Sequence, residues 1–450
     1  MRLGDARGRT LRGTFLHAPV AGEVEALVDA VVRVGDDGTI SAVLRRGAAG
    51  YEAAAKDAVA IGGYVLPGFV DLHVHAPQYA QLGQALDEPL EVWLGKYTFP
   101  LEARYADLDF ARPRYEALIA DLLANGTTTA MYFATVDLAA TQLLADIAMA
   151  HGQRALIGKV VMDDPRSCPP DYRDASAASG IAETQAFIDY VRTSPANAEG
   201  RVSPVITPRF IPSCTDEALA GLGALSAETG AHVQTHCSES DWAHGHALER
   251  YGETDTMALR RFGLLGRKTV LAHSNFITDG DMTGIAQAGA AVAHCPVSNA
   301  YFANAVFPLR RALEKGLHVG LGTDISGGPI SSIFEAARAS VQASRMLEGG
   351  VDPALPQNRR GVADSAVTIA TAFHLATAGG GIALDLPIGV FAPGYKFDAM
   401  RVDADAPDGD VRLFGEREPE AVLEKILYTA SRANLVEIWV DGQSVSGAGQ

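Results

Sequence analysis

Between residues 67 and about 380, short apolar runs alternate with longer segments of helical periodicity, and this alternation constrains the fold most strongly. Eight of the apolar runs have the length and composition of buried strands. Eight strands with helices between them are typical of a parallel (β/α)₈ barrel. An open doubly wound sheet is the structural alternative, but no GxGxxG sequence follows the first strand. The expected strands cover residues 69–75, 127–135, 155–161, 202–210, 232–237, 269–274, 290–295 and 318–324.

Strand-like runs also occur in both terminal regions, outside this alternation. Near the N-terminus, two apolar runs are joined by the sequence DDG at 36–38, which favours a β-hairpin. Towards the C-terminus, further apolar runs are separated by Gly and Pro turns. We therefore expect residues 1–66 and 385–450 to pair into one small β-domain, beside a catalytic barrel domain of residues 67–384.

The acidic composition of the chain argues against several kinds of partner. The 450 residues carry a formal net charge of −17 at pH 7; 48% are apolar and 20% are charged. Such a chain has no electrostatic attraction for nucleic acid or anionic membranes, and no apolar run has membrane-spanning length. The first residues lack the continuous apolar stretch of a secretory signal peptide, so we expect none. The scattered cysteines, without a CxxC, favour a reducing cytoplasm; they are Cys168, Cys214, Cys237 and Cys295.

Two histidines end the first expected barrel strand, in the sequence FVDLHVH. Alternate residues on a strand face the same way, so His73 and His75 converge on one point, and two neutral imidazoles suit a metal ion. For this pair alone, a polar strand end facing solvent is the alternative. However, active-site residues of a barrel lie at the carboxyl ends of its strands, and the fifth, sixth and eighth strands end in His236, His273 and Asp324. The whole set favours Zn²⁺, with Fe²⁺ as the alternative.

Two carboxylates near these histidines suit hydrolytic chemistry. A metal of this kind lowers the pKa of its bound water to about 7. Asp324 is placed to accept a proton from that water, and Glu239, three residues after His236, is placed to carry a proton to the substrate. Alternatively, Glu239 is a surface carboxylate at a helix N-terminus, where the helix dipole favours it. A metal-binding protein without catalysis is the rival from another class, and it predicts a closed coordination shell.

The sequences PGFVDLHVH, THCSE, LAHS, AHCPVSN and GTDISGG resemble motifs of the metal-dependent amidohydrolase superfamily. Within it, HAPQY, LEVWLGKYTFPLEARYAD, NGTTTAMYFAT, GKVVMD and TPRF are similar to the guanine deaminase family, over about residues 60–440. The resemblance implies a distorted (β/α)₈ TIM barrel flanked by a small β-sandwich built from both chain ends. It also implies zinc-dependent hydrolysis of guanine to xanthine and ammonia, a reaction of purine catabolism, in a cytoplasmic homodimer.

The same resemblance implies roles for individual residues. Gln78, Arg209 and Phe210 would hold the purine base: the amide and the guanidinium by hydrogen bonds, the phenyl ring by stacking. His236 would contact the substrate as well as the metal, and the metal and His273 would stabilise charge at the reacting centre. The residues implied to bind one zinc ion are His73, His75, His236, His273 and Asp324.

The fourth strand ends in TPRF, without the lysine that two-metal members of the superfamily use, which favours a single metal ion. Two other sequences depart from the family pattern and leave the substrate open. Val297 replaces a polar residue in CPVSN, and the polar stretch 349–364 is not explained by the resemblance. A pterin or 8-oxoguanine, which share an edge with guanine, therefore stay as alternative substrates, and a triazine is a further candidate. The stretch 76–112 is the expected lid.

Overall fold

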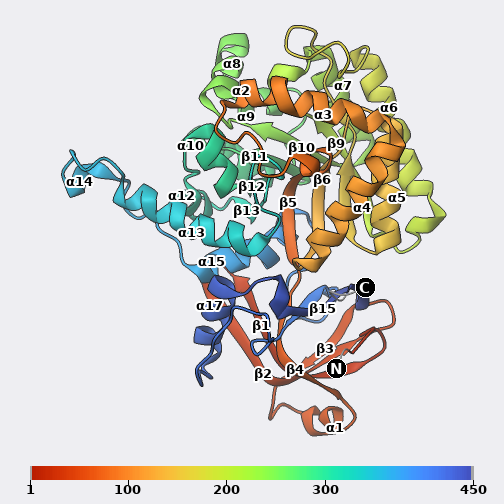
Figure 1. Ribbon diagram of the computed structural model, residues 1–450, viewed down its shortest axis with the longest axis vertical. Helices are drawn as coiled ribbons and strands as arrows, with labels where there is room; N and C mark the ends of the chain where they lie inside the picture. The colour runs from red at the N-terminus through yellow and green to blue at the C-terminus, as the bar shows by residue number, and fades with distance from the viewer. Residues whose placement is uncertain (1–2, 447–450) are drawn as a thin grey trace.

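The computed structural model describes residues 3–446. Figure 1 shows a barrel with a separate β-sheet below it. The barrel is parallel and nearly closed, and the lower sheet takes strands from the beginning and the end of the chain. These features confirm the predicted fold class, a distorted (β/α)₈ barrel beside a small domain built from both chain ends. The domain boundaries at 66/67 and 384/385 stay a prediction.

The eight expected barrel strands are all present, and their ends lie within a few residues of the predicted positions. Each strand pairs in parallel with its neighbours along the barrel. Where the last strand meets the first, the N–H of Asp324 donates to the carbonyl of His73 and the N–H of His75 donates to the carbonyl of Ile325, each over 2.9 Å. The strands are β5 (Phe69–His75), β6 (Thr127–Phe133), β7 (Arg154–Gly158), β9 (Val202–Pro208), β10 (His232–Cys237), β11 (Thr269–His273), β12 (Ala291–His294) and β13 (His318–Leu321), and the short β8 (Val160–Val161) pairs with β9.

Helices cover the outside of the barrel, and local sequence explains many of their ends. The helices are α4 (Leu108–Ala124), α5 (Leu138–His151), α6 (Ala177–Thr193), α7 (Asp216–Thr229), α8 (Asp241–Tyr251), α9 (Asp255–Arg261), α10 (Asp279–Ala288), α11 (Pro296–Ser298), α12 (Leu309–Glu314), α13 (Ile333–Gly349), α15 (Ile369–His374) and α16 (Gly380–Ala383). The side chain of Asp107 caps the start of α4, and Ser176 begins α6 in a capping box. Gly152 and Gly230, both in the left-handed conformation, end α5 and α7.

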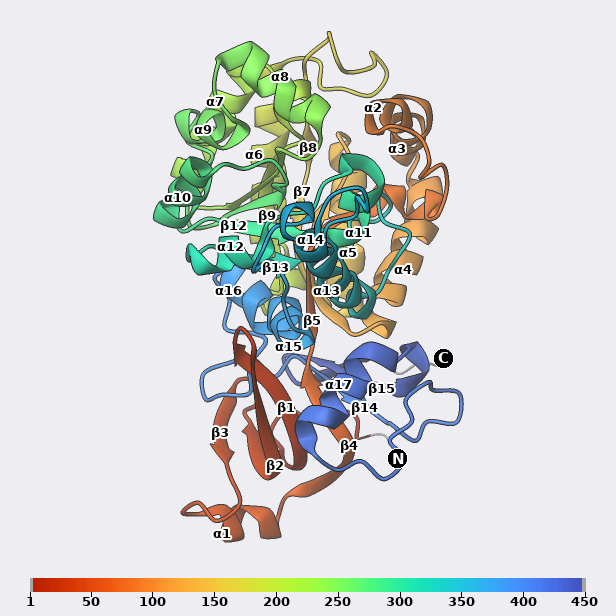
Figure 2. The same cartoon turned by 90° about the vertical axis from the view of Figure 1, so that its left-hand side faces the viewer.

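The segment between β5 and α4 crosses the end of the barrel that lies away from the small sheet (Figure 2). It consists of short helical pieces: η1 (Ala76–Gln81), α2 (Leu90–Trp93), η2 (Leu94–Thr98), α3 (Phe99–Ala103) and η3 (Arg104–Ala106). Its apolar side chains, among them Trp93 and Phe99, pack in one cluster with Phe210 and Phe302 from other parts of the barrel rim. The expected lid segment therefore covers the barrel at the carboxyl ends of its strands.

The small sheet has the strand order β16-β15-β14-β4-β1-β2-β3 within the described residues. The predicted hairpin is present between β2 and β3, with Gly38 at a positive φ of 76° in its turn. The strands are β1 (Thr10–Val20), β2 (Glu23–Val34), β3 (Ile40–Leu44), β4 (Val59–Pro67), β14 (Ala399–Val402), β15 (Leu435–Val440) and β16 (Gln443–Ser446), with α1 (Tyr51–Lys56) and α17 (Pro419–Thr429) beside them. Because β4 is followed after one residue by β5, the small sheet leads directly into the barrel.

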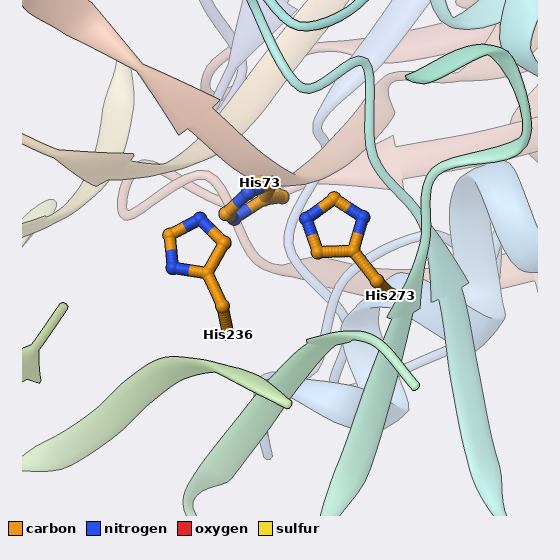
Figure 3. Close-up of side chains that lie close together, drawn as sticks. All are labelled: His73, His236 and His273. Carbon is orange, nitrogen blue, oxygen red and sulfur yellow. The ribbon is translucent and has the colours of Figure 1, made fainter. Parts of the chain in front are cut away.

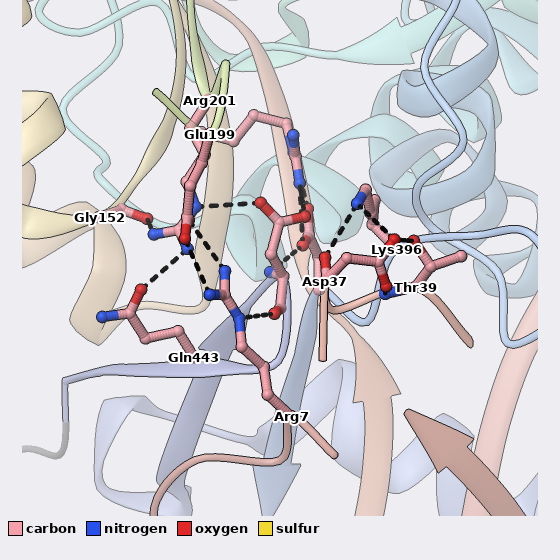
Figure 4. Close-up of polar contacts among 11 residues, drawn as sticks. Arg7, Asp37, Thr39, Gly152, Glu199, Arg201, Lys396 and Gln443 are labelled. Carbon is pink, nitrogen blue, oxygen red and sulfur yellow. Dashed lines mark hydrogen bonds and ion pairs between the residues drawn. The ribbon is translucent and has the colours of Figure 1, made fainter. Parts of the chain in front are cut away.

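A buried ionic network joins the small sheet to the barrel. Arg154, at the start of β7, donates to Asp398 over 2.9 Å and to Asp441 over 2.6 Å. Arg201 also donates to Asp441 over 3.0 Å. Figure 4 shows the contact between Arg201 and Gln443, in which Arg201 donates over 2.8 Å. Burial lowers the pKa of Arg154, but the two aspartates outweigh burial and raise it overall. Arg154 therefore stays charged, and the network holds the base of the barrel on the sheet.

The polar stretch at 349–364 follows α13 and contains α14 (Gln357–Arg360). It projects from the side of the barrel in Figure 1, and Val351 within it is 73% exposed. Among the helices of residues 3–446, none combines the length and the apolar character needed to cross a membrane.

Candidate active site

Five of the predicted site residues lie at the carboxyl ends of four barrel strands. His73 and His75 alternate on β5, His236 lies in β10, His273 ends β11, and Asp324 follows β13. The backbone is left-handed at His273 (φ 67°) and at Asp324 (φ 51°). Residues other than glycine rarely adopt this conformation, and such strained positions concentrate at functional sites. The local backbone thus marks the same strand ends that the sequence singled out.

The nitrogen and oxygen atoms of these residues converge in a buried cluster. Figure 3 shows His73, His236 and His273 facing a common centre, and their ligand atoms lie within 4.8 Å of one another. Oδ1 of Asp324 lies 3.2 Å from Nε2 of His73 and 3.6 Å from Nε2 of His75. Nε2 of His75 lies 3.0 Å from Nε2 of His236. The structure therefore brings the five residues into one buried cluster, within which overlapping groups of three could hold a metal ion.

Hydrogen bonds outside the cluster set the protonation of the imidazoles. Nδ1 of His236 lies 2.6 Å from the carbonyl oxygen of Arg209, which only accepts, so the proton of His236 belongs on Nδ1. Nδ1 of His273 contacts Oδ1 of Asn299 over 3.0 Å in the same way. Nε2 of both rings then carries a lone pair towards the centre. Among the described residues, the buried Nε2 atoms of His73 and His273 find no hydrogen-bond partner, which is costly without a ligand. This donor set fits a divalent ion.

Burial also controls the charge states in the cluster. It lowers the pKa values of His73, His75 and His236 well below the usual range, so these rings are neutral and available as ligands. Burial, followed by the nearby charge of Asp324, raises the pKa of Glu239 well above its usual range. Oε1 of Glu239 lies 3.5 Å from Nε2 of His273. A carboxyl group held protonated beside the cluster is suited to donating a proton.

The predicted base-binding residues form one wall of the cavity beside this cluster. Gln78 and Arg209 are 1% and 2% exposed, and the ring of Phe210 lies 6.0 Å from that of His236. Gln78 and Arg209 both donate to Glu102, which the sequence reasoning did not single out. The residues lining the cavity are His75, Gln78, Leu90, Trp93, Leu94, Arg209, Phe210, His236, Glu239, Phe302, Asp324 and Gly327.

Apolar side chains from two separate segments close the cavity on the outside. The rings of Trp93, in α2, and Phe302, in η6 (Asn299–Ala303), lie 5.0 Å apart. Gly327 lines the cavity as well, and a Cβ atom there would lie 2.7 Å from Oδ2 of Asp324. Only glycine leaves that carboxylate its position. The cavity is thus lined by polar side chains near the cluster and by apolar side chains from these two segments, a combination typical of small-molecule sites.

Three further residues support the site and were not singled out individually, although each lies within a sequence quoted for the family resemblance. Glu102 and Asn299 contact predicted site residues from distant segments. Asp71, fully buried below the cluster, accepts hydrogen bonds from the N–H of His73 and from Thr323, next to Asp324. Burial raises the pKa of Asp71 to about 7. Only the position of Asp71, two residues before His73, could have drawn attention to it.

Comparisons with known proteins agree with this geometry. The model of the amidohydrolase family matches residues 64–445. A guanine deaminase of Dictyostelium discoideum is 33% identical, over 97% of this chain and 98% of that protein. A guanine deaminase of Homo sapiens is 35% identical, over 96% of both chains. Among solved structures, a guanine deaminase from C. acetobutylicum with guanine bound in the active site has a TM-score of 0.87 and 28% identity, over 97% of this chain and 99% of that one.

Proposed function

The chain belongs to the amidohydrolase family, and we propose that it is a guanine deaminase, which hydrolyses guanine to xanthine and ammonia. It is thus a hydrolase that acts on C–N bonds. The observation that carries the proposal is a wall of amide and guanidinium donors placed beside a buried His/Asp cluster in one cavity. That combination supplies both the recognition of a purine edge and the site of hydrolysis.

We assign one Zn²⁺ ion to this site, with Fe²⁺ as the alternative. The ligands we propose are His73, His75, His236, His273 and Asp324. When bound, the ion supplies a water of lowered pKa and stabilises negative charge. The unpartnered Nε2 atoms and the neutral rings support this assignment.

The proton transfers are assigned to two carboxyl groups. Asp324 accepts a proton from the attacking water and orients it towards C2 of the base. Glu239 protonates a ring nitrogen and then assists departure of ammonia, and its burial supports this role by favouring the protonated form. His273 would help to stabilise the charge that develops when water adds to C2, and a bound ion would supply further stabilisation there.

We assign recognition of the base to four residues. Gln78 donates to and accepts from the purine edge, and Arg209 donates to it. Phe210 stacks on the face of the base, and His236 contacts the substrate beside the metal. These residues line the same cavity. A pterin or 8-oxoguanine would meet the same edge, so these remain the alternative substrates.

The cellular location, the oligomeric state and the partners are also proposals. We propose that the protein is a cytoplasmic homodimer that acts on a small purine in purine catabolism, without nucleic-acid or membrane partners. The net charge of −17 supports the absence of nucleic-acid binding.

The function is tested by ammonia release from metal-quantified protein with guanine, 8-oxoguanine, isoxanthopterin, adenine, cytosine and a triazine. Fast release from guanine with about one zinc per chain is the expected result. Ammonia release from a pterin or 8-oxoguanine alone would show that one of these is the substrate instead of guanine. Metal binding without ammonia release from any compound would contradict catalysis. Arg209→Ala should weaken guanine turnover while metal content stays normal; loss of metal would mean that its role is misassigned.

A further inference from the structure

Glu102 is a buried carboxylate that the proposed mechanism does not use. It lies in α3, in the segment that crosses the barrel mouth, and its side chain is fully buried. A buried carboxylate is costly unless it is paired and hydrogen-bonded. The hydrogen-bond partners of Glu102 therefore indicate its role.

Three donors meet at the two oxygens of Glu102. Nη1 of Arg209 donates to Oε2 over 2.6 Å and Nη2 of Arg209 donates to Oε1 over 3.1 Å, which is a two-point ion pair. Nε2 of Gln78 donates to Oε1 over 2.7 Å. One carboxylate thus holds both residues to which we assign the hydrogen bonds of the base.

These contacts decide how Gln78 faces the cavity. Its Nε2 is committed to Glu102, and its Oε1 accepts from the backbone N–H of Ser326 over 3.2 Å. The amide therefore cannot turn over without losing both bonds. The Gln78 amide therefore keeps one N–H of Nε2 and one lone pair of Oε1 for the base, and the positions of this donor and this acceptor are fixed.

The same contacts decide the charge of the wall. A guanidinium keeps its charge in proteins, and both Nη atoms of Arg209 donate to the carboxylate of Glu102. Glu102 compensates that charge, and the wall offers directed donors without net charge. An uncompensated guanidinium would instead favour anions.

This distinction separates substrate from product. Deamination replaces the amino group of guanine by a carbonyl group, so the product has an N–H flanked by two carbonyls and is more acidic than the substrate. Because Gln78, Arg209 and Glu102 together carry no net charge, they bind a neutral base more tightly than the anion of the product.

We propose that Glu102 is a positioning residue that orients Gln78 and Arg209 and makes the site selective for a neutral base over its anionic product. This inference rests on the proposed function and deepens it. It assigns no contact between Glu102 and the substrate.

The test compares wild-type protein with Glu102→Gln in the metal-loaded state. The variant should raise KM for guanine about 10- to 100-fold, with a smaller change in kcat, because the donors lose their orientation. Inhibition by xanthine is measured below and above the pKa of xanthine. In wild type, inhibition weakens as xanthine becomes an anion; in the variant, it strengthens, because Arg209 is no longer compensated.

Two further variants make the result specific. Asp174→Asn removes another buried carboxylate, one that pairs with Lys159 outside the cavity, and it should change neither KM nor the pH trend of inhibition. The double variant Glu102→Gln/Arg209→Gln removes both charges, so it should not show the stronger inhibition by anionic xanthine that is expected for Glu102→Gln. It also keeps the inference testable if the single variant folds poorly.

An unchanged KM, or a pH trend of inhibition shared by Glu102→Gln and wild type, would overturn the inference. A preference for the anion that persists in the double variant would overturn it as well. Absence of guanine turnover by wild type would instead overturn the proposed function, so the two failures are distinguishable.

Discussion

The carbonyl oxygen of Arg209 lies 2.6 Å from Nδ1 of His236, while the side chain of the same Arg209 lines the neighbouring cavity. One residue therefore orients an imidazole of the cluster through its backbone and contacts the cavity through its side chain. The tautomer of His236 and the position of this side chain are set by the same segment after β9. A shift of this segment would disturb both at once.

The first prediction concerns the proton carrier. Glu239→Gln should retain metal but lose kcat by about 10²- to 10⁴-fold, because the amide cannot donate a carboxyl proton. Ammonia release and metal content of the purified protein measure the two effects. Glu249→Gln, an exposed position on α8, is the matched control and should behave as wild type. Near-normal turnover of Glu239→Gln would contradict the proposed role.

The second prediction concerns the partner of His273. Asn299→Ala removes the oxygen that holds Nδ1 of His273, and should weaken metal affinity by about 10- to 100-fold. Competition with a chelator of known affinity measures the change. Asn358→Ala, on the exposed α14, is the control. Equal metal affinity in Asn299→Ala and wild type would show that Asn299 does not orient the ring.

The third prediction concerns the network between barrel and sheet. Arg154→Met leaves Asp398 without its buried cation and should lower the free energy of unfolding by about 3–5 kcal/mol. Arg112→Gln breaks an exposed pair with Glu116 on α4, and its cost should stay below about 1 kcal/mol. Denaturant unfolding compares the two. Equal losses in both variants would contradict the importance of the buried network.

The fourth prediction concerns the pH dependence of stability. The hydrogen bond to Asp255 is the largest cause that raises the pKa of His244 above 6.5. Protonated His244 thus stabilises the fold below pH 6.5, and this contribution disappears as the pH rises through the folded pKa. His244→Gln should therefore lose more free energy of unfolding at acid pH than at alkaline pH.

His246, two residues along α8, provides the control of opposite sign. Burial lowers the pKa of His246 and so favours the neutral imidazole in the folded protein. The free energy of unfolding therefore falls as acid pH protonates His246. The stability of His246→Gln relative to wild type should improve as the pH falls. Unfolding curves across the titration range of histidine check both variants, and parallel pH profiles would contradict both assignments.

Local sequence determined the elements and the chemistry of this protein to a large extent. Apolar runs of strand length predicted the eight main strands of the barrel, but not the separate short strand β8, because burial on both faces leaves a continuous apolar pattern that needs no knowledge of the partners. His73, His75 and Asp324 could be singled out because ligand chemistry resides in the side chain and strand ends are visible locally. The hairpin at 36–38 followed from turn chemistry alone.

Tertiary structure alone decided the contacts that join distant segments. Glu102 meets Arg209 across 107 positions, and Arg154 meets Asp398 across 244. A lone glutamate in a short helix or an arginine at a strand start has no periodicity that reveals its partner. Their roles depend on burial and on an oppositely charged neighbour in the folded structure. A charge in water needs no partner, whereas a buried charge is costly unless it is paired.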